Sequence, residues 1–351
     1  MSTIITIIIT IITLGVMIFV HELGHFLAAK SMGIQVNEFA LGFGPTIFKF
    51  TKGETTYALR ALPFGGYVNM EGENEESENE RAFNRKRRWP RVFVLSAGAV
   101  MNLLLGFLIV ILLVVPFIPL ASATVAKFSD DATSNAVLRE GDTILRINGS
   151  RIRIGDDIFI ALFHTGGNPV NMTVDRNGEI KEFVVPLKVE ETDGITMPVR
   201  DFYIYTAPKT FLSSIRYSFF YTIVNVKLVW ISLTGLVTGR FPVTQMSGPV
   251  GIVNAIGQAR AVGWPNLFML ISMITVNLGI FNLLPVPGLD GGRLLFILVE
   301  AVRGKPVPAK YEAYVHAAGI ILLIGFMVFI TYNDIVKSDW FISFWTRITG
   351  G

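Results

Sequence analysis

The chain has 351 residues, of which 51% are hydrophobic and only 16% charged, and its mean hydropathy is +0.53. This composition is typical of a membrane protein and excludes an ordinary soluble domain. The lack of cysteine excludes disulfides and thiolate metal sites, and the net charge of +3 gives no indication that nucleic acid is a partner.

The first element is an uncharged apolar run, residues 1–20, which leads into the sequence HELGH at 21–25. Two histidines four residues apart lie on one face of a helix, so both can bind one zinc ion, and the glutamate beside them can activate a water molecule. The motif also occurs by chance, but ionisable side chains at membrane depth are costly and usually functional. We therefore predict a metal site. A cleaved signal peptide is not expected, because no basic segment precedes the apolar run.

A glycine-rich cytoplasmic loop follows. Residues 34–41, 45–50 and 55–61 are predicted to be extended, with glycines in the turns between them. An ordinary surface hairpin is the simplest interpretation. The acidic run 71–80 is interpreted as a solvated loop, and the basic residues of 85–91 as a membrane anchor that touches anionic lipid.

Four stretches are long and apolar enough to cross a bilayer of ~30 Å, which takes about 20 residues. They are 4–26, 92–120, 267–289 and 313–333. The basic residues before the second stretch place 27–91 in the cytoplasm, so 121–210 lies outside. A fifth apolar stretch, 213–238, carries Arg216 and Lys227. Since the 267–289 span must start outside, the fifth stretch is predicted to lie at the interface without crossing, and both termini are expected outside.

The outer segment has scattered charge, polar turns and short runs typical of strands, at 143–148, 170–174 and 182–187. Asn-Gly pairs at 148–149 and 177–178 indicate turns. We therefore expect a small folded domain on the outer side.

A third protein ligand is expected, because zinc sites have at least three. Asp290 follows the third apolar span at the depth expected for His21 and His25, where a carboxylate is costly unless it is paired or bound to metal. The alternative is an ordinary turn aspartate. The prolines and glycines around Asp290 break the helix, which membrane proteins tolerate only where the backbone is buried or lines a cavity. Hydrolysis requires such a cavity.

Other polar residues of the spans have alternative roles. Asn277 and Asn282 can hydrogen-bond between helices, and Asn282, which is nearest the break, can instead hold a substrate backbone. His164 lies in the outer domain, and His316 is expected to make a hydrogen bond between helices. Both histidines are excluded from the ligand set.

Four motifs together resemble the site-2 protease family of intramembrane zinc metalloproteases, in the bacterial branch typified by the regulator of sigma-E protease. They are HELGH at 21–25, GGYV at 65–68, SAGAVMN at 96–102 and NLLPVPGLDGG at 282–292. The resemblance implies that zinc is bound by His21, His25 and Asp290, that Glu22 is the catalytic base, and that the substrate is engaged by Asn282, Pro285 and Pro287.

The resemblance also implies that the cytoplasmic loop is a membrane-re-entrant β-loop beside the active site, where a strand edge captures an extended substrate. Residues 135–152 resemble the core of a PDZ domain, which either binds a peptide or acts as a steric filter. Two features depart from the family. Many members have Gly-Pro where this chain has Gly98-Ala99, and some carry two PDZ domains where this chain has room for one.

The expected fold is a polytopic α-helical membrane protein with four transmembrane helices, a cytoplasmic-side re-entrant β-loop and one extracytoplasmic PDZ-like domain. The expected segments are transmembrane helix 1 (1–30), the β-loop and charged loop (31–91), transmembrane helix 2 (92–120), the PDZ-like domain (121–208), interfacial amphipathic helices (209–266), transmembrane helix 3 (267–292), and the cytoplasmic link, transmembrane helix 4 and tail (293–351).

The expected function is intramembrane zinc proteolysis in the cell inner membrane, with the active site toward the cytoplasm. By resemblance, its partners are the lipid bilayer and single-span proteins already shortened on their outer side, such as anti-sigma factors or remnant signal peptides. A zinc-binding transporter or sensor, and an inactive scaffold that presents its PDZ domain, are the alternatives.

Overall fold

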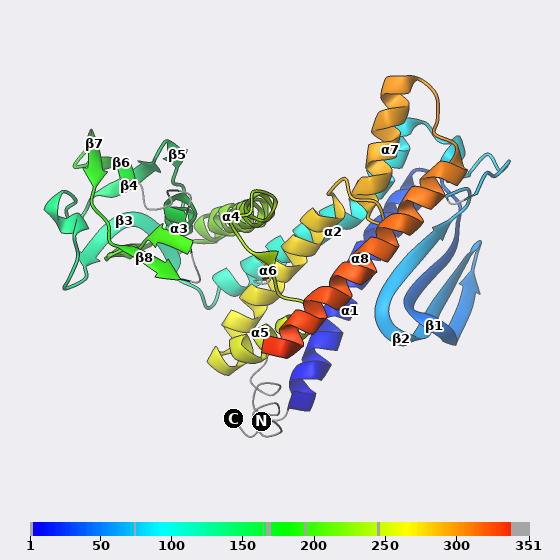
Figure 1. Ribbon diagram of the computed structural model, residues 1–351, viewed down its shortest axis with the longest axis horizontal. Coiled ribbons are helices and arrows are strands. Elements are labelled where there is room, and N and C mark those ends of the chain that lie inside the picture. Colours follow the sequence, from blue (N-terminus) through cyan, green and yellow to red (C-terminus); the bar gives the residue numbers. More distant parts are fainter. Residues whose placement is uncertain are drawn as a thin grey trace. The chain divides into compact units, whose positions relative to one another are not determined.

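The computed structural model describes residues 3–73, 75–163, 165, 170–192, 195–243 and 246–337. The chain divides into two compact units (Figure 1). Residues 1–106 and 244–351 form one, which we call the helical unit, and residues 107–243 form the other, the sheet unit. His164 lies outside the described residues.

The helical unit contains most of the long helices and one small sheet. Its elements are α1 (Thr3–Ser31), β1 (Val36–Lys52), β2 (Thr55–Met70), the 3-10 turn η1 (Phe83–Arg85), the first part of α2 (Arg88–Val114), α5 (Pro249–Val262), α6 (Trp264–Asn282), α7 (Asp290–Arg303) and α8 (Ala309–Lys337). Five described helices are long and apolar enough to cross a membrane: α1, α2, α6, α8 and, in the sheet unit, α4 (Phe211–Val237). This fits a polytopic membrane protein; the membrane position of α4 stays a prediction.

Small residues let the long helices of the helical unit approach closely. A Cβ atom on Gly24 of α1 would lie 2.5 Å from the Ala97 carbonyl oxygen of α2. The Ser272 hydroxyl of α6 donates to the Gly106 carbonyl of α2 at 2.9 Å. A Cβ on Gly279, one to two turns further along α6, would lie 2.9 Å from the carbonyl oxygen of residue 99. These pairs make α2 antiparallel to α6.

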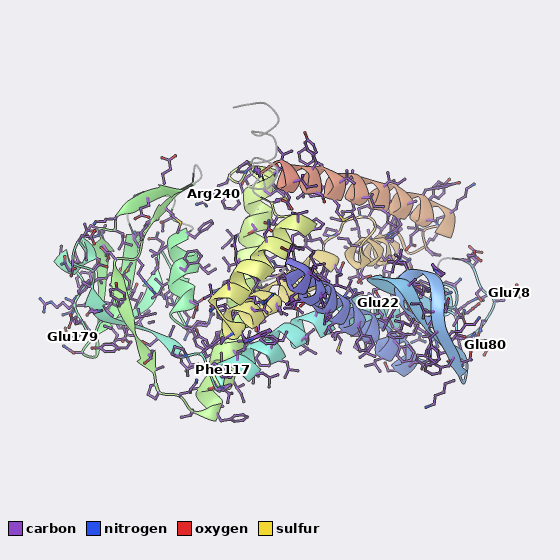
Figure 2. All side chains as sticks on the ribbon, turned by 90° about the horizontal axis from the view of Figure 1, so that it is seen from below. Glu22, Glu78, Glu80, Phe117, Glu179 and Arg240 are labelled. Carbon is purple, nitrogen blue, oxygen red and sulfur yellow. The ribbon has the colours of Figure 1, made fainter. Side chains whose placement is uncertain are left out.

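β1 and β2 fold into a sheet against the end of α1, and Glu22 is labelled where α1 borders that sheet (Figure 2). Both strands bend, so that Ala40 pairs with Tyr67 on one side and with Ala58 on the other. Residues 66–70 therefore form one edge of the sheet. The predicted extended segments are confirmed, and β2 continues further than expected, to Met70.

Two predicted spans end earlier than expected. The second was extended to residue 120, but α2 ends at Val114 and β3 begins at Leu120, because Pro116 and Pro119 cannot continue a helix. The third was extended to residue 289, but α6 ends at Asn282, since Pro285 disfavours helical backbone in the residue before it. Proline thus overrides apolar composition at both ends.

The sheet unit combines a sheet with two helices. Its elements, after the end of α2, are β3 (Leu120–Phe128), the 3-10 turn η2 (Ser134–Ala136), β4 (Thr143–Ile147), β5 (Ser150–Arg151), α3 (Asp156–Phe163), β6 (Val170–Arg176), β7 (Glu179–Val185), β8 (Val189–Thr192), β9 (Ile195–Pro198), β10 (Phe202–Ala207) and α4. The main sheet has the order β10-β3-β4-β6-β7, with β5 paired to β4, and β8 pairs with β9. The three outer strands expected from the sequence are confirmed.

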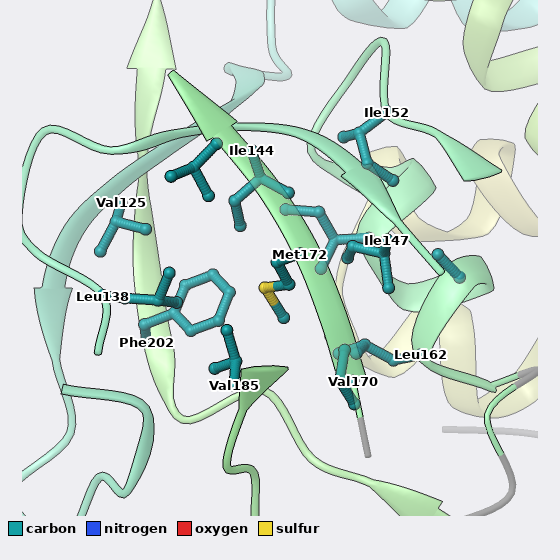
Figure 3. Close-up of a cluster of buried hydrophobic side chains, with 13 residues drawn as sticks. Val125, Leu138, Ile144, Ile147, Ile152, Leu162, Val170, Met172, Val185 and Phe202 are labelled. Carbon is teal, nitrogen blue, oxygen red and sulfur yellow. The ribbon is translucent and has the colours of Figure 1, made fainter. Parts of the chain in front are cut away.

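The core of the sheet unit is apolar and well buried (Figure 3). Ile144, Met172 and Phe202 are at most 2% exposed and come from three different strands. Two asparagines that were predicted to make turns, Asn148 and Asn177, adopt positive φ of 45° and 54°, as tight hairpin turns require.

α4 is held on α3 within the sheet unit by two polar contacts. Lys227 Nζ lies 2.5 Å from Asp157 Oδ1, and the Tyr217 hydroxyl donates to Asp156 Oδ2 at 2.6 Å. Asp157 is nearly fully buried, at 3% exposure. The charge near the middle of α4 is therefore paired with this folded domain.

Candidate metal centre

Three side chains from opposite ends of the sequence meet at one point of the helical unit. His21 Nε2 lies 3.1 Å from Asp290 Oδ2, His25 Nε2 lies 3.2 Å from the same oxygen, and the two Nε2 atoms are 3.2 Å apart. Ligand atoms about 2.0–2.2 Å from a tetrahedral zinc ion lie roughly 3.3–3.5 Å from one another. The two imidazoles and the carboxylate therefore fit zinc in spacing and in ligand type.

The local sequence explains why each side chain points to this place. α1 runs without interruption through the HELGH motif, so His21 and His25 are one turn apart on one face. Asp290 is the first residue of α7. The glycines after it leave room for the preceding turn, because a Cβ on Gly291 would lie 2.1 Å from the Leu284 carbonyl oxygen and one on Gly292 would lie 2.6 Å from that of residue 286. The turn therefore folds back tightly and presents Asp290 to α1.

Hydrogen bonds to α2 orient both imidazoles. His25 Nδ1–H donates to the Val94 carbonyl at 2.8 Å, which leaves Nε2 free as a metal ligand. His21 Nδ1 lies 3.3 Å from the side-chain amide of Asn102. Asn102 is fully buried, and its Oδ1 has no partner among the described residues. Because amide oxygen and nitrogen are interchangeable in such assignments, turning the amide lets Oδ1 accept the His21 Nδ1–H.

Gly98 makes α2 the floor of the site. A Cβ atom on Gly98 would lie 2.4 Å from His25 Nε2 and 2.9 Å from His21 Nε2. Any larger residue would therefore occupy the space beside the two ligand nitrogens.

A cavity of about 220 Å³ adjoins two of the three expected ligands, His25 and Asp290. Glu22, His25 and Asp290 line it on one side, and residues 66–68 of the β2 edge line it on another. A Cβ on Gly66 would lie 3.1 Å from Glu22 Cγ, so the strand edge and the glutamate are in close contact. The cavity is large enough for a short extended peptide segment beside Glu22.

The residues predicted to engage substrate lie just outside this cavity. Asn282 ends α6, half-buried, and Pro285 and Pro287 lie in the turn before α7. The cavity is lined instead by Gly288 and Leu289 of the same turn. The substrate role of the three residues stays a prediction.

Sequence reasoning missed the support that α2 gives to the site. Gly98 and Asn102 both lie in the SAGAVMN run, which was matched only as a motif. The sequence did carry a signal for this support: the polar amide of Asn102 lies one turn after Gly98 inside an otherwise uncharged span. His316 was expected to make a hydrogen bond between helices; its Nδ1 instead accepts from the backbone N–H of Gly288, in the turn between α6 and α7, at 3.0 Å.

Comparison with known proteins gives a consistent result. The model of peptidase family M50 matches residues 9–326. A Clostridium perfringens protein provisionally named as a zinc metalloprotease is 37% identical over 94% of this chain and 98% of its own length. The regulator of sigma-W protease RasP of Bacillus subtilis is 32% identical over 95% of this chain and 98% of its own. The zinc metalloprotease RasP of Bacillus licheniformis is also 32% identical, over 95% and 99%.

Proposed function

Because the chain belongs to peptidase family M50, and is therefore a membrane-embedded zinc metalloprotease of the site-2 type, we propose that it hydrolyses peptide bonds within or near the transmembrane segments of single-span proteins. The observation that carries this proposal is the meeting of His21, His25 and Asp290 beside Glu22, at a cavity among helices of transmembrane length. This arrangement supports a catalytic role for Glu22 at a position that a membrane-embedded substrate can reach.

In this proposal His21, His25 and Asp290 hold the zinc ion. When bound there, zinc supplies a Lewis acid that polarises the scissile carbonyl and makes a water molecule more acidic. The Val94 carbonyl and Asn102 keep the two imidazoles in the tautomer that leaves Nε2 available.

Glu22 moves the proton. Its carboxylate accepts a proton from the attacking water as the new bond to the carbonyl carbon forms, and it returns that proton to the amine nitrogen as the peptide bond breaks. Glu22 is the only carboxylate of the HELGH motif. It lines the cavity, so its carboxylate reaches the space where water and peptide would meet.

The β2 edge is the proposed place of substrate capture. Residues 66–70 pair with β1 on one side, and on the other side no strand pairs with them in the described part of the chain. A helical peptide shields its own backbone, so a substrate has to become extended before attack, and an exposed edge stabilises the extended form by strand addition. Asn282, Pro285 and Pro287 are proposed to assist from the turn before α7.

The proposed membrane arrangement has four spans, with the active site toward the cytoplasm and both termini outside the inner membrane. α1 and α2 are antiparallel, and Arg260 of α5 donates to the Thr6 hydroxyl at 3.4 Å, which places α5 beside the start of α1. The chain thus leaves the helical unit along α2 and re-enters it at the same end. This supports an interfacial α4 and a single outer, PDZ-like domain that excludes substrates with large outer parts.

The name of the Bacillus subtilis relative, a regulator of sigma-W protease, supports anti-sigma factors as substrates; remnant signal peptides are the second proposed class.

The proposal is tested by mapping products. Purified protein is incubated in detergent with a single-span model substrate that has either a short or a long folded outer domain, and the fragments are identified by mass spectrometry. We expect cleavage inside the apolar segment of the short form and little of the long form. Cleavage confined to soluble loops would contradict the proposal.

A further inference from the structure

His316, which the zinc chemistry does not use, lines the active-site cavity. It lies near the start of α8, with its ring 5.7 Å from that of Phe296. Its Nδ1 accepts the Gly288 N–H at 3.0 Å. Gly288 has a φ of +96° and comes two residues before Asp290, so this bond holds the turn from which α7 begins.

That hydrogen bond fixes the tautomer of the ring. A nitrogen that accepts from a backbone N–H carries no proton of its own, so the proton of the neutral imidazole is on Nε2. The Nε2 atom is buried and has no hydrogen-bond partner in the described part of the chain. A buried donor without an acceptor is costly, and such a group calls for an explanation.

α8 holds the ring firmly in this position. A Cβ on Gly319, one turn after His316, would lie 2.1 Å from the Pro287 carbonyl oxygen. A Cβ on Gly288 would lie 3.1 Å from the Ile320 backbone nitrogen. The helix and the turn are therefore in backbone contact one turn after His316, which fixes the position of the imidazole.

An extended substrate on the β2 edge needs donors on its far side. In a strand, alternate backbone groups point to opposite sides, so only half of the carbonyls of an added segment face residues 66–70. The others face away from that edge. Gly66, Tyr67 and Val68 line the same cavity as Gly288, His316 and Ile320, so the imidazole borders the space that an added segment would occupy.

We propose that His316 is a substrate-binding residue, whose Nε2–H donates to an outward-facing backbone carbonyl of the extended substrate, while its Nδ1 positions the turn that carries Asp290. This inference rests on the proposed function. It assigns the ring two separate hydrogen bonds, and two substitutions separate them.

An asparagine oxygen takes the place of Nδ1, whereas a glutamine amide nitrogen reaches the place of Nε2. His316→Asn thus keeps an acceptor for Gly288 and loses the substrate donor, and His316→Gln does the reverse. For wild type and both variants, kcat and KM are measured with a fluorogenic single-span peptide in detergent micelles, together with zinc per chain. Glu22→Gln gives the background rate.

We expect His316→Asn to bind as much zinc as wild type and to lose about tenfold in kcat/KM, mainly through KM, because one hydrogen bond to bound substrate is lost. His316→Gln keeps the donor and should therefore retain more kcat/KM per zinc-loaded chain than His316→Asn. A wild-type KM for His316→Asn, or loss of its zinc, would overturn the role of His316. A wild type no faster than Glu22→Gln would instead refute the proposed function itself.

Discussion

At the metal site, the backbone of α2 lies against both histidine rings, and only a hydrogen atom fits on Gly98. We predict that Gly98→Ala binds far less than one zinc per chain and has no activity, because the new Cβ would lie 2.4 Å from His25 Nε2. Gly15→Ala is the matched control, since a Cβ there meets nothing within 4 Å. Metal analysis of both purified variants checks this; full zinc binding by Gly98→Ala would contradict the geometry.

Asn102 acts on the metal through His21. We expect Asn102→Ala to weaken zinc affinity about 10–100-fold, as is typical when a partner of a ligand imidazole is removed. Asn102→Asp keeps an acceptor oxygen and should retain more affinity than alanine. Competition with a chelator measures both. Equal affinity of the alanine variant and wild type would show that Asn102 does not orient His21.

The residues of the site differ in how far sequence alone predicts them. His21 and His25 are one turn apart, so their convergence needs no tertiary information, and Asp290 stands out as a lone carboxylate beside broken helix. Their meeting is observed, while their roles stay predictions. Asn102 and His316 act through contacts between helices, whose register depends on packing that no local pattern encodes.

At the scale of elements, the turn between α6 and α7 is held by α8. A Cβ on Gly319 would lie 2.1 Å from the Pro287 carbonyl oxygen, whereas one on Gly325 of the same helix meets nothing within 4 Å. We predict that Gly319→Ala pushes α8 off the turn and lowers kcat/KM at least tenfold, while Gly325→Ala is close to wild type. Peptidase assays on zinc-loaded protein check this. Equal rates would mean that the turn tolerates the displacement.

Element types were largely predictable and their ends were not. The length of the apolar stretches predicted α1, α2, α6 and α8. Crossing a bilayer requires about 20 apolar residues, and uncharged stretches of that length are uncommon for other reasons. The ends at Val114 and Asn282 are set by nearby prolines. The pairing of β1 with two different segments of β2 could not be predicted, because the local sequence pattern of a strand does not indicate which segments it pairs with.

At the scale of the whole molecule, the central question is on which side of the membrane each segment lies. The chain has no cysteine, so single introduced cysteines report their side without background. We predict that Lys209→Cys and Thr238→Cys, at the two ends of α4, both react with a membrane-impermeant thiol reagent added outside cells. Arg303→Cys, after α7, should react only once the membrane is opened. Opposite labelling of residues 209 and 238 would show that α4 crosses.

The most direct test of the account compares wild type with Glu22→Gln for zinc per chain and for cleavage of one single-span substrate with a short outer domain. We predict about one zinc per chain in both proteins and cleavage only by wild type, because Glu22 moves a proton without holding the metal. Equal cleavage by both proteins would contradict the proposed role of Glu22. Loss of zinc from Glu22→Gln would contradict the assignment of the metal to His21, His25 and Asp290.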